Sequence, residues 1–149
     1  MRTKQASKSN VWTDEERSAM QESARERKSA AKRGSVNERA EGEREVQAKI
    51  AEMTPAERVM AERIHELITT GAPVLVPRTY YGMPAYAKDG KVICFFQPAS
   101  KFKVRYSTFG FQPEAAIDDG EMWPVAFALT KLTPGTERRI AELVKKAVG

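Results

Sequence analysis

The stretch that decides the fold is residues 79–110, TYYGMPAYAKDGKVICFFQPASKFKVRYSTFG. Asp89-Gly90 lies near its middle, between two runs that are rich in aromatic and β-branched residues. An Asp-Gly pair suits a two-residue type I′ turn, because both central residues of that turn need a positive φ. The stretch therefore predicts an antiparallel β-meander.

We expect three strands in this meander. The first, over 79–88, contains Gly82 and Pro84, and a proline cannot donate a hydrogen bond to a neighbouring strand, so this strand is predicted to be bulged or to lie at an edge. The second, over 92–97, is continuously apolar and is typical of a central strand. The third, over 101–109, alternates between polar and apolar residues, as a half-exposed strand does.

Helix signals flank the meander. Thr13 with Glu16, and Thr54-Pro55-Ala56-Glu57, are capping-box sequences, and proline is favoured at the first position of a helix. Apolar residues at helical spacing follow them and recur near the C-terminus. The sequence predicts helices over about 13–33, 42–53, 55–71, 113–119 and 134–148, and a further strand over 123–129.

This order of elements predicts an α+β fold. We expect a mostly antiparallel sheet of about four to five strands with helices packed on one side. Residues 1–40 are predicted to be a charged extension, partly helical and partly disordered, and residues 41–149 to be the α+β domain.

The composition limits the classes of function. The chain has 149 residues, a net charge of +5 and one cysteine, so it can form no intramolecular disulfide and no site that needs two thiolates. Cys94 lies in an apolar run and is predicted to be buried and inert. His65 is the single histidine and is expected to be a partly exposed helix residue. Because no apolar run is long enough to span a bilayer, we expect a cytoplasmic protein without a membrane partner.

The segment Tyr81-Gly82-Met83-Pro84-Ala85-Tyr86 and the later segment Asp119-Gly120-Glu121-Met122-Trp123-Pro124 carry a resemblance to a known family. Together with Phe95-Phe96 and Lys103, they resemble the YdhG-like family over about residues 46–149. These are small bacterial domains of mostly unknown function, and the resemblance implies an α+β domain. Some members are described as intracellular iron chaperones and compared with frataxin, so the resemblance also points to iron as a ligand.

Three groups of residues are candidates for a site. Asp118, Asp119 and Glu121 belong to the densest acidic group of the domain, and carboxylates suit hard cations, although such acids also decorate helix ends. Lys103 and Arg105 share a basic strand face that can bind an anion, a phosphate or a nucleic-acid backbone, although such a face is also normal on a solvated sheet.

The third group is the predicted bulged strand with Tyr81, Met83 and Tyr86, close to Trp123. Bulges gather near binding sites, and tyrosine hydroxyls can line the mouth of a pocket. The other interpretation is that the proline protects a sheet edge and that the aromatic rings pack in the core.

No nucleophile motif and no phosphate-binding glycine loop is present, which favours a binding domain over an enzyme. The sequence therefore predicts a non-enzymatic domain that binds a small anion or a weakly held iron ion, with no other cofactor indicated. Its ligand site is predicted to consist of Tyr81, Met83, Tyr86, Lys103, Arg105 and Trp123, and a metal site of Asp118, Asp119 and Glu121. The alternative is an interaction module in which the charged helix over 13–33 binds a protein or, with less support, a nucleic acid.

Overall fold

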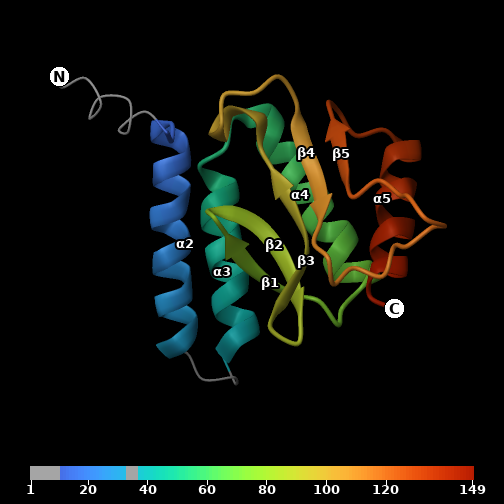
Figure 1. The fold of residues 1–149 in the computed structure, drawn as a ribbon, viewed down its shortest axis with the longest axis horizontal. Coiled ribbons are helices and arrows are strands. Elements are labelled where there is room, and N and C mark those ends of the chain that lie inside the picture. Colours follow the sequence, from blue (N-terminus) through green and yellow to red (C-terminus); the bar gives the residue numbers. More distant parts are fainter. Residues whose placement is uncertain (1–10, 33–36) are drawn as a thin grey trace.

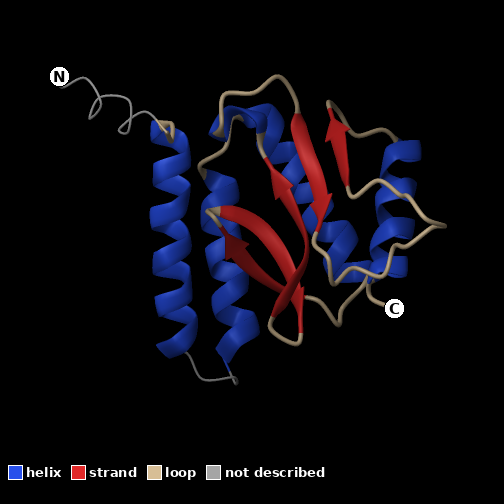
Figure 2. Ribbon diagram, viewed as in Figure 1, coloured by secondary structure: helices blue, strands red, loops and turns tan. Residues whose placement is uncertain are grey.

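A computed structural model describes residues 11–32 and 37–149 of the chain. In these residues, helices α2, α3 and α4 precede a five-stranded sheet and α5 follows it (Figures 1 and 2). The helices are α2 (Asp14–Lys32), α3 (Glu38–Ala51), α4 (Pro55–Gly71) and α5 (Pro134–Ala147). The strands are β1 (Val76–Tyr80), β2 (Met83–Lys88), β3 (Lys91–Gln97), β4 (Ser107–Phe111) and β5 (Ala126–Leu129). The predicted α+β class is confirmed.

The sheet is an antiparallel meander in which each strand pairs with the next, in the order β1-β2-β3-β4-β5. Asp89 and Gly90 have φ values of 51° and 80°, and Lys88 pairs with Lys91. The predicted two-residue turn between β2 and β3 is therefore confirmed.

The prediction of a single strand over 79–88 is wrong. Tyr81 and Gly82 have φ values of 52° and 77°, and Tyr80 pairs with Met83, so these two residues form a second tight turn between β1 and β2. The irregularity that was expected near Gly82 and Pro84 lies instead between Tyr86 and Ala87, where the register of β2 against β3 shifts.

The strand predicted over 101–109 is also shorter than expected. A short 3₁₀ turn, η2 (Ala99–Lys101), follows β3, and Lys103 has a φ of 56°. A residue in the left-handed region cannot continue a strand. The strand therefore begins only at Ser107, and the alternating basic face through Lys101, Lys103 and Arg105 does not form. The helix expected over 113–119 is likewise absent from this described segment.

The core lies between one face of the sheet and helices α3, α4 and α5. Tyr86, Cys94 and Phe96 are among its fully buried side chains, which confirms the prediction of a buried thiol at Cys94. Helix α3 approaches β1 so closely that a Cβ at Gly42 would collide with the carbonyl oxygen of Pro77. Glycine at this position thus allows the two backbones to touch.

Helix α2 runs beside α3 and reaches the turn between β1 and β2 (Figure 1). The capping box predicted at its start is confirmed, because the Glu16 N–H donates to the Thr13 hydroxyl and the Thr13 N–H donates to the Glu16 carboxylate. The disorder predicted for the first ten residues and the break predicted at Gly34-Ser35 lie outside the described residues.

Candidate functional site

An open pocket of about 400 Å³ lies between α2 and the sheet, and we call it the α2 pocket. Its size is in the range of small-molecule sites. The residues that line it come from α2, β1, the β1–β2 turn, β3 and the segment after β4. They are Ser23, Glu26, Arg27, Arg78, Tyr80, Tyr81, Lys91, Val92, Gln112 and Glu114.

Glu26 fixes one wall of the α2 pocket. Its carboxylate accepts hydrogen bonds from the backbone N–H groups of Tyr81 (2.9 Å) and Gly82 (2.8 Å). These two amides point the same way because both residues have a positive φ, which makes the turn a small anion-binding concavity. The carboxylate of α2 occupies that concavity and so holds the helix against the turn.

Glu22, one helical turn earlier, adds a second anchor for α2. Its carboxylate binds the ammonium groups of Lys49 at 2.6 Å and Lys101 at 2.8 Å, and its side chain is only 12% exposed. Burial alone would raise the pKa of Glu22, but the two ammonium groups outweigh burial and hold this pKa below its ordinary value. Glu22 is therefore charged at neutral pH and bridges α2, α3 and the end of η2.

The cations of the α2 pocket make fewer contacts than Glu26 does. Arg27 donates to the Ser23 hydroxyl at 2.7 Å, and Arg78 makes one long contact of 3.5 Å with the Thr79 carbonyl. Within the described part of the chain, no carboxylate pairs with Arg27, Arg78 or Lys91. The pocket thus presents three positive charges without an ion pair, against the two carboxylates of Glu26 and Glu114 in the same lining.

Two tyrosines supply the aromatic part of the α2 pocket. The rings of Tyr80 and Tyr81 meet edge to face with centroids 4.7 Å apart, and Tyr80 also packs against Phe95. The Gln112 amide donates to the Tyr80 hydroxyl at 3.3 Å. Burial, reinforced by the neighbouring Tyr81, raises the pKa of Tyr80, so this hydroxyl stays protonated at neutral pH.

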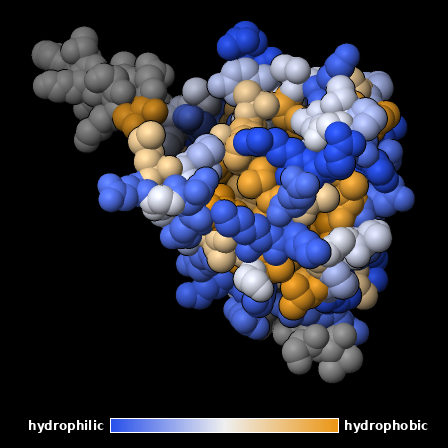
Figure 3. Space-filling view, turned by 90° about the vertical axis from the view of Figure 1, so that its right-hand side faces the viewer, coloured by the Kyte–Doolittle hydropathy of each residue, from blue (hydrophilic) through white to orange (hydrophobic). Residues whose placement is uncertain are grey.

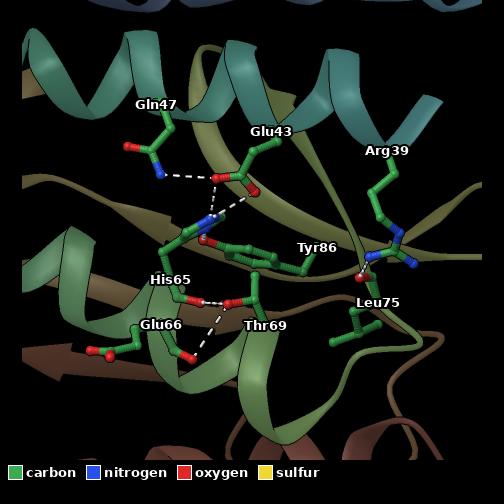
Figure 4. Close-up of polar contacts among 8 residues, drawn as sticks. All are labelled: Arg39, Glu43, Gln47, His65, Glu66, Thr69, Leu75 and Tyr86. Carbon is green, nitrogen blue, oxygen red and sulfur yellow. Dashed lines mark hydrogen bonds and ion pairs between the residues drawn. The ribbon is translucent and has the colours of Figure 1, made fainter. Parts of the chain in front are cut away.

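A second polar cluster runs from the core to the surface, where α3, α4 and β2 meet (Figure 4). His65 is 7% exposed, its Nδ1 lies 2.8 Å from the Tyr86 hydroxyl, and its Nε2 lies 2.8 and 2.9 Å from the two carboxylate oxygens of Glu43. Gln47 donates a further hydrogen bond to Glu43. The expectation that His65 is partly exposed is therefore wrong, because its two ring nitrogens satisfy polar groups of two other elements.

The electrostatics of this cluster keep Glu43 ionised and Tyr86 protonated at neutral pH. Burial would raise the pKa of Glu43, but its hydrogen bonds with Gln47 and His65 lower it below the ordinary value. Burial raises the pKa of Tyr86 well above its ordinary value, with Cys94 and Glu43 adding to the effect. The ionised Glu43 carboxylate therefore accepts from the Nε2–H of His65, and a hydrogen bond joins the Nδ1 of His65 to the Tyr86 hydroxyl. The cluster joins three elements, and none of its members lines the α2 pocket.

The six residues predicted to form one ligand site lie in several places. Tyr81 lines the α2 pocket, whereas Met83 and Tyr86 are buried in the protein. Lys103 is exposed and pairs with Glu15 at 2.9 Å. Arg105 is exposed and lies over the Tyr106 ring, and Trp123 is partly buried against the core. The structure therefore does not bring the six together in the α2 pocket, because the split of the first strand and the turn at Lys103 redirect their side chains.

The three acids predicted to bind a metal are all exposed in the segment between β4 and β5: Asp118, Asp119 and Glu121. Among the described residues, no group of three or more His, Cys, Asp and Glu side chains is placed to hold a metal ion. Cys94 is fully buried in the core, and burial raises the pKa of its thiol strongly.

Sequence reasoning missed most of the α2 pocket. Glu26 and Arg27 lie in the helix that the sequence assigns to an extension, and Arg78 lies just before the predicted first strand. One signal was present: Tyr81-Gly82 followed by Pro84 and preceded by Pro77 can be read as a turn between two short strands.

A comparison of the chain with protein-family models, curated proteins and solved structures finds no match. The resemblance to the YdhG-like family therefore stays a prediction. None of the helices in residues 11–32 and 37–149 is long and apolar enough to cross a membrane.

Proposed function

We propose that this protein is a binding domain for a small organic anion, which it holds in the α2 pocket. The observation that carries the proposal is the set of three cations, Arg27, Arg78 and Lys91, that face one 400 Å³ pocket without a carboxylate partner. Two carboxylates also line the pocket, those of Glu26 and Glu114, but neither pairs with these cations, so the lining keeps an excess of one positive charge. A bound carboxylate or phosphate supplies the opposite charge.

The aromatic wall suggests what accompanies the charge. Tyr80 and Tyr81 offer ring surface beside the cations, and Val92 adds an apolar contact. Aromatic rings stack on planar groups, and a few polar side chains then fix the orientation of the ligand. We therefore favour an anion with a planar part, such as an aromatic carboxylate or a mononucleotide, over bare phosphate. Iron is not favoured, because no metal-holding group is found among the described residues.

Isothermal titration calorimetry on the full chain tests this proposal. The probes are phosphate, citrate, benzoate and adenosine monophosphate. We expect the two planar anions to bind more tightly than phosphate. Arg78→Ala should weaken that binding by about tenfold or more, because a charge-assisted hydrogen bond contributes roughly 1.5–3 kcal/mol.

Arg58→Ala is the matched control, since Arg58 is exposed on α4 and does not line the α2 pocket. It should leave the affinity within about twofold, because surface substitutions away from a site change free energies by only about 0.5 kcal/mol. The proposal fails if none of the four probes releases heat at millimolar concentration, or if Arg58→Ala weakens binding as much as Arg78→Ala.

The alternative is that the charged helix α2 serves mainly to bind a partner. Its carboxylates argue against this role, because those of Glu15, Glu22 and Glu26 already contact Lys103, two further lysines and the β1–β2 turn of the same chain. A partner would have to compete with these contacts. We therefore assign α2 to the wall of the pocket.

A further inference from the structure

Strand β5 leaves one edge of the sheet open. Among the described residues it pairs with β4 alone, because it is the last strand of the meander. Nine consecutive residues around it, 122–130, carry no charge, and Met122 among them is 89% exposed. Edge strands are usually protected by a charge, a proline or a bulge, because an open edge can pair with another chain. Within β5 itself none of these protections is present.

The hydrogen-bond pattern shows which backbone groups face the open edge. The Phe111 N–H donates to the Val125 carbonyl at 2.7 Å, and the register of β4 against β5 continues from this pair. Hydrogen-bonded and non-hydrogen-bonded pairs alternate in antiparallel strands, so Phe127 and Leu129 bond to β4. Ala126 and Ala128 therefore direct their N–H and C=O groups outward, and in the described chain these groups have no partner.

An apolar groove of about 110 Å³ runs beside this edge, between β5 and α5. It is lined by Phe127, Leu129, Ile140 and Leu143. Figure 3 views the molecule from this side and shows hydrophobic side chains at the surface among hydrophilic ones. An apolar cavity of about 150 Å³ holds benzene, so this groove has room for one branched aliphatic side chain.

Arg139 places one positive charge at the rim of the groove, with its guanidinium 5.4 Å from the centre of the Phe127 ring. The same helix also carries Arg138, Lys145 and Lys146, against Glu137 and Glu142. No carboxylate pairs with Arg139 within the described residues. The charge that complements this rim is negative.

From these observations we propose that the open edge of β5 binds an extended segment of a partner protein, which adds to the sheet as a sixth strand. The segment carries an aliphatic side chain opposite Phe127, where it enters the groove, and an acidic side chain two positions away on the same face, within reach of Arg139. Backbone hydrogen bonds supply affinity and the groove supplies specificity, as in other cases of strand addition. This proposal does not depend on the ligand of the α2 pocket.

A second copy of the chain fits the edge less well. Helix α5 flanks the open edge (Figure 1), so a symmetric pairing of two β5 strands brings two α5 helices to the same junction. Both helices are basic, with Arg138, Arg139, Lys145 and Lys146 against Glu137 and Glu142. Repulsion between the two helices opposes this pairing. An acidic strand of a partner protein brings no second basic helix to the junction, so it meets no such repulsion.

Nuclear magnetic resonance on the full, ¹⁵N-labelled chain tests the proposal with a defined probe. The probe is a capped heptapeptide with valine at its centre, glutamate two positions to either side and threonine elsewhere. At saturation we expect hydrogen exchange at the amides of Ala126 and Ala128 to slow by about tenfold or more, because both amides gain a partner. The same peptide with lysine in place of glutamate should bind about tenfold more weakly.

Two variants separate backbone pairing from charge. Ala128→Pro removes the outward N–H and spares the bonds to β4, so it should lower the affinity for the glutamate peptide about tenfold. Ala128→Ser keeps the N–H, so its affinity for the same peptide should stay within about twofold of the parent chain. Arg139→Glu should reverse the preference between the two peptides. This second test does not depend on whether the Ala128→Pro variant folds.

Three results would overturn the proposal. The first is an unchanged exchange rate at Ala126 and Ala128 with millimolar peptide. The second is a preference for the glutamate peptide that Arg139→Glu leaves intact. The third is a free chain that sediments as a dimer with these two amides already protected, since a second copy then occupies the edge.

Discussion

Tyr86 and His65 are polar residues that the core accepts because each satisfies the other. The Tyr86 side chain is fully buried, and its hydroxyl has the Nδ1 atom of His65 as its hydrogen-bond partner at 2.8 Å. A buried polar group without a partner costs more free energy than the bond itself returns. The pair therefore stabilises the fold only while both members are present.

Tyr86→Phe tests this dependence. The substitution keeps the ring but leaves the Nδ1 of His65 without a partner, so the free energy of unfolding should fall by about 1–3 kcal/mol in urea titrations at pH 7. Tyr106→Phe is the control, because Tyr106 is exposed, and it should change stability by less than about 0.5 kcal/mol. Equal effects of the two substitutions would contradict the role given to the pair.

Single residues also show what the sequence alone can and cannot predict. Burial of Cys94 was predictable from its apolar neighbours, whatever the topology. The place of Tyr86 was not, because the side chains of a strand alternate between faces and a two-residue turn at Tyr81-Gly82 resets that alternation. Tyr81 was placed in a ligand site and does line a pocket, but its neighbours there come from α2 and β1.

At the scale of elements, the two tight turns of the sheet differ in how strongly the local sequence predicts them. Both have nearly the same backbone, with φ values of 52° and 77° at Tyr81-Gly82 and 51° and 80° at Asp89-Gly90. Asp-Gly is a strong local signal for such a turn, whereas tyrosine is a poor residue for a positive φ. Tyr81 adopts it where Glu26, 55 residues away in the chain, accepts both turn amides. A pattern of neighbouring residues cannot reveal so distant a partner.

The two turn glycines allow a matched test of how α2 is held. Gly82→Ala and Gly90→Ala introduce the same backbone strain, roughly 1–2 kcal/mol, because both glycines have a positive φ. A Cβ at Gly82 would also collide with the Glu22 carboxylate, whereas a Cβ at Gly90 meets nothing. Displacing Glu22 breaks its contacts with Lys49 and Lys101.

We therefore expect Gly82→Ala to destabilise the protein by at least about 1 kcal/mol more than Gly90→Ala, because charge-assisted hydrogen bonds are lost only at the first site. Thermal unfolding of both variants beside the parent chain measures the difference. If the two variants unfold at the same temperature, Glu22 yields to the new methyl group without loss and does not anchor α2.

Across the whole molecule, the core is held by apolar packing and α2 mainly by carboxylate contacts, and this difference implies two levels of stability. The sheet and helices α3, α4 and α5 share a continuous apolar core. Helix α2 buries little by comparison: Ala19 and Ser23 are the buried residues of its described part, and its firm contacts are the carboxylates of Glu22 and Glu26. Segments that are held by few apolar contacts open before the core does. We therefore expect α2, which forms one wall of the α2 pocket, to open before the core.

Lowering the pH should open α2 before it unfolds the core. The pKa of Glu22 is lowered in the folded protein, so its contribution to stability is complete above the ordinary glutamate pKa of about 4.3 and is lost as the pH falls through the lowered value. We expect hydrogen-exchange protection factors in α2 to collapse below about pH 4, while those of β3 and α4 persist to lower pH. Glu22→Gln removes the titrating group, so α2 should be less protected at pH 7 and its protection should depend less on pH. Loss of protection in α2 and β3 at one common pH would mean that the helix and the core unfold as a single unit.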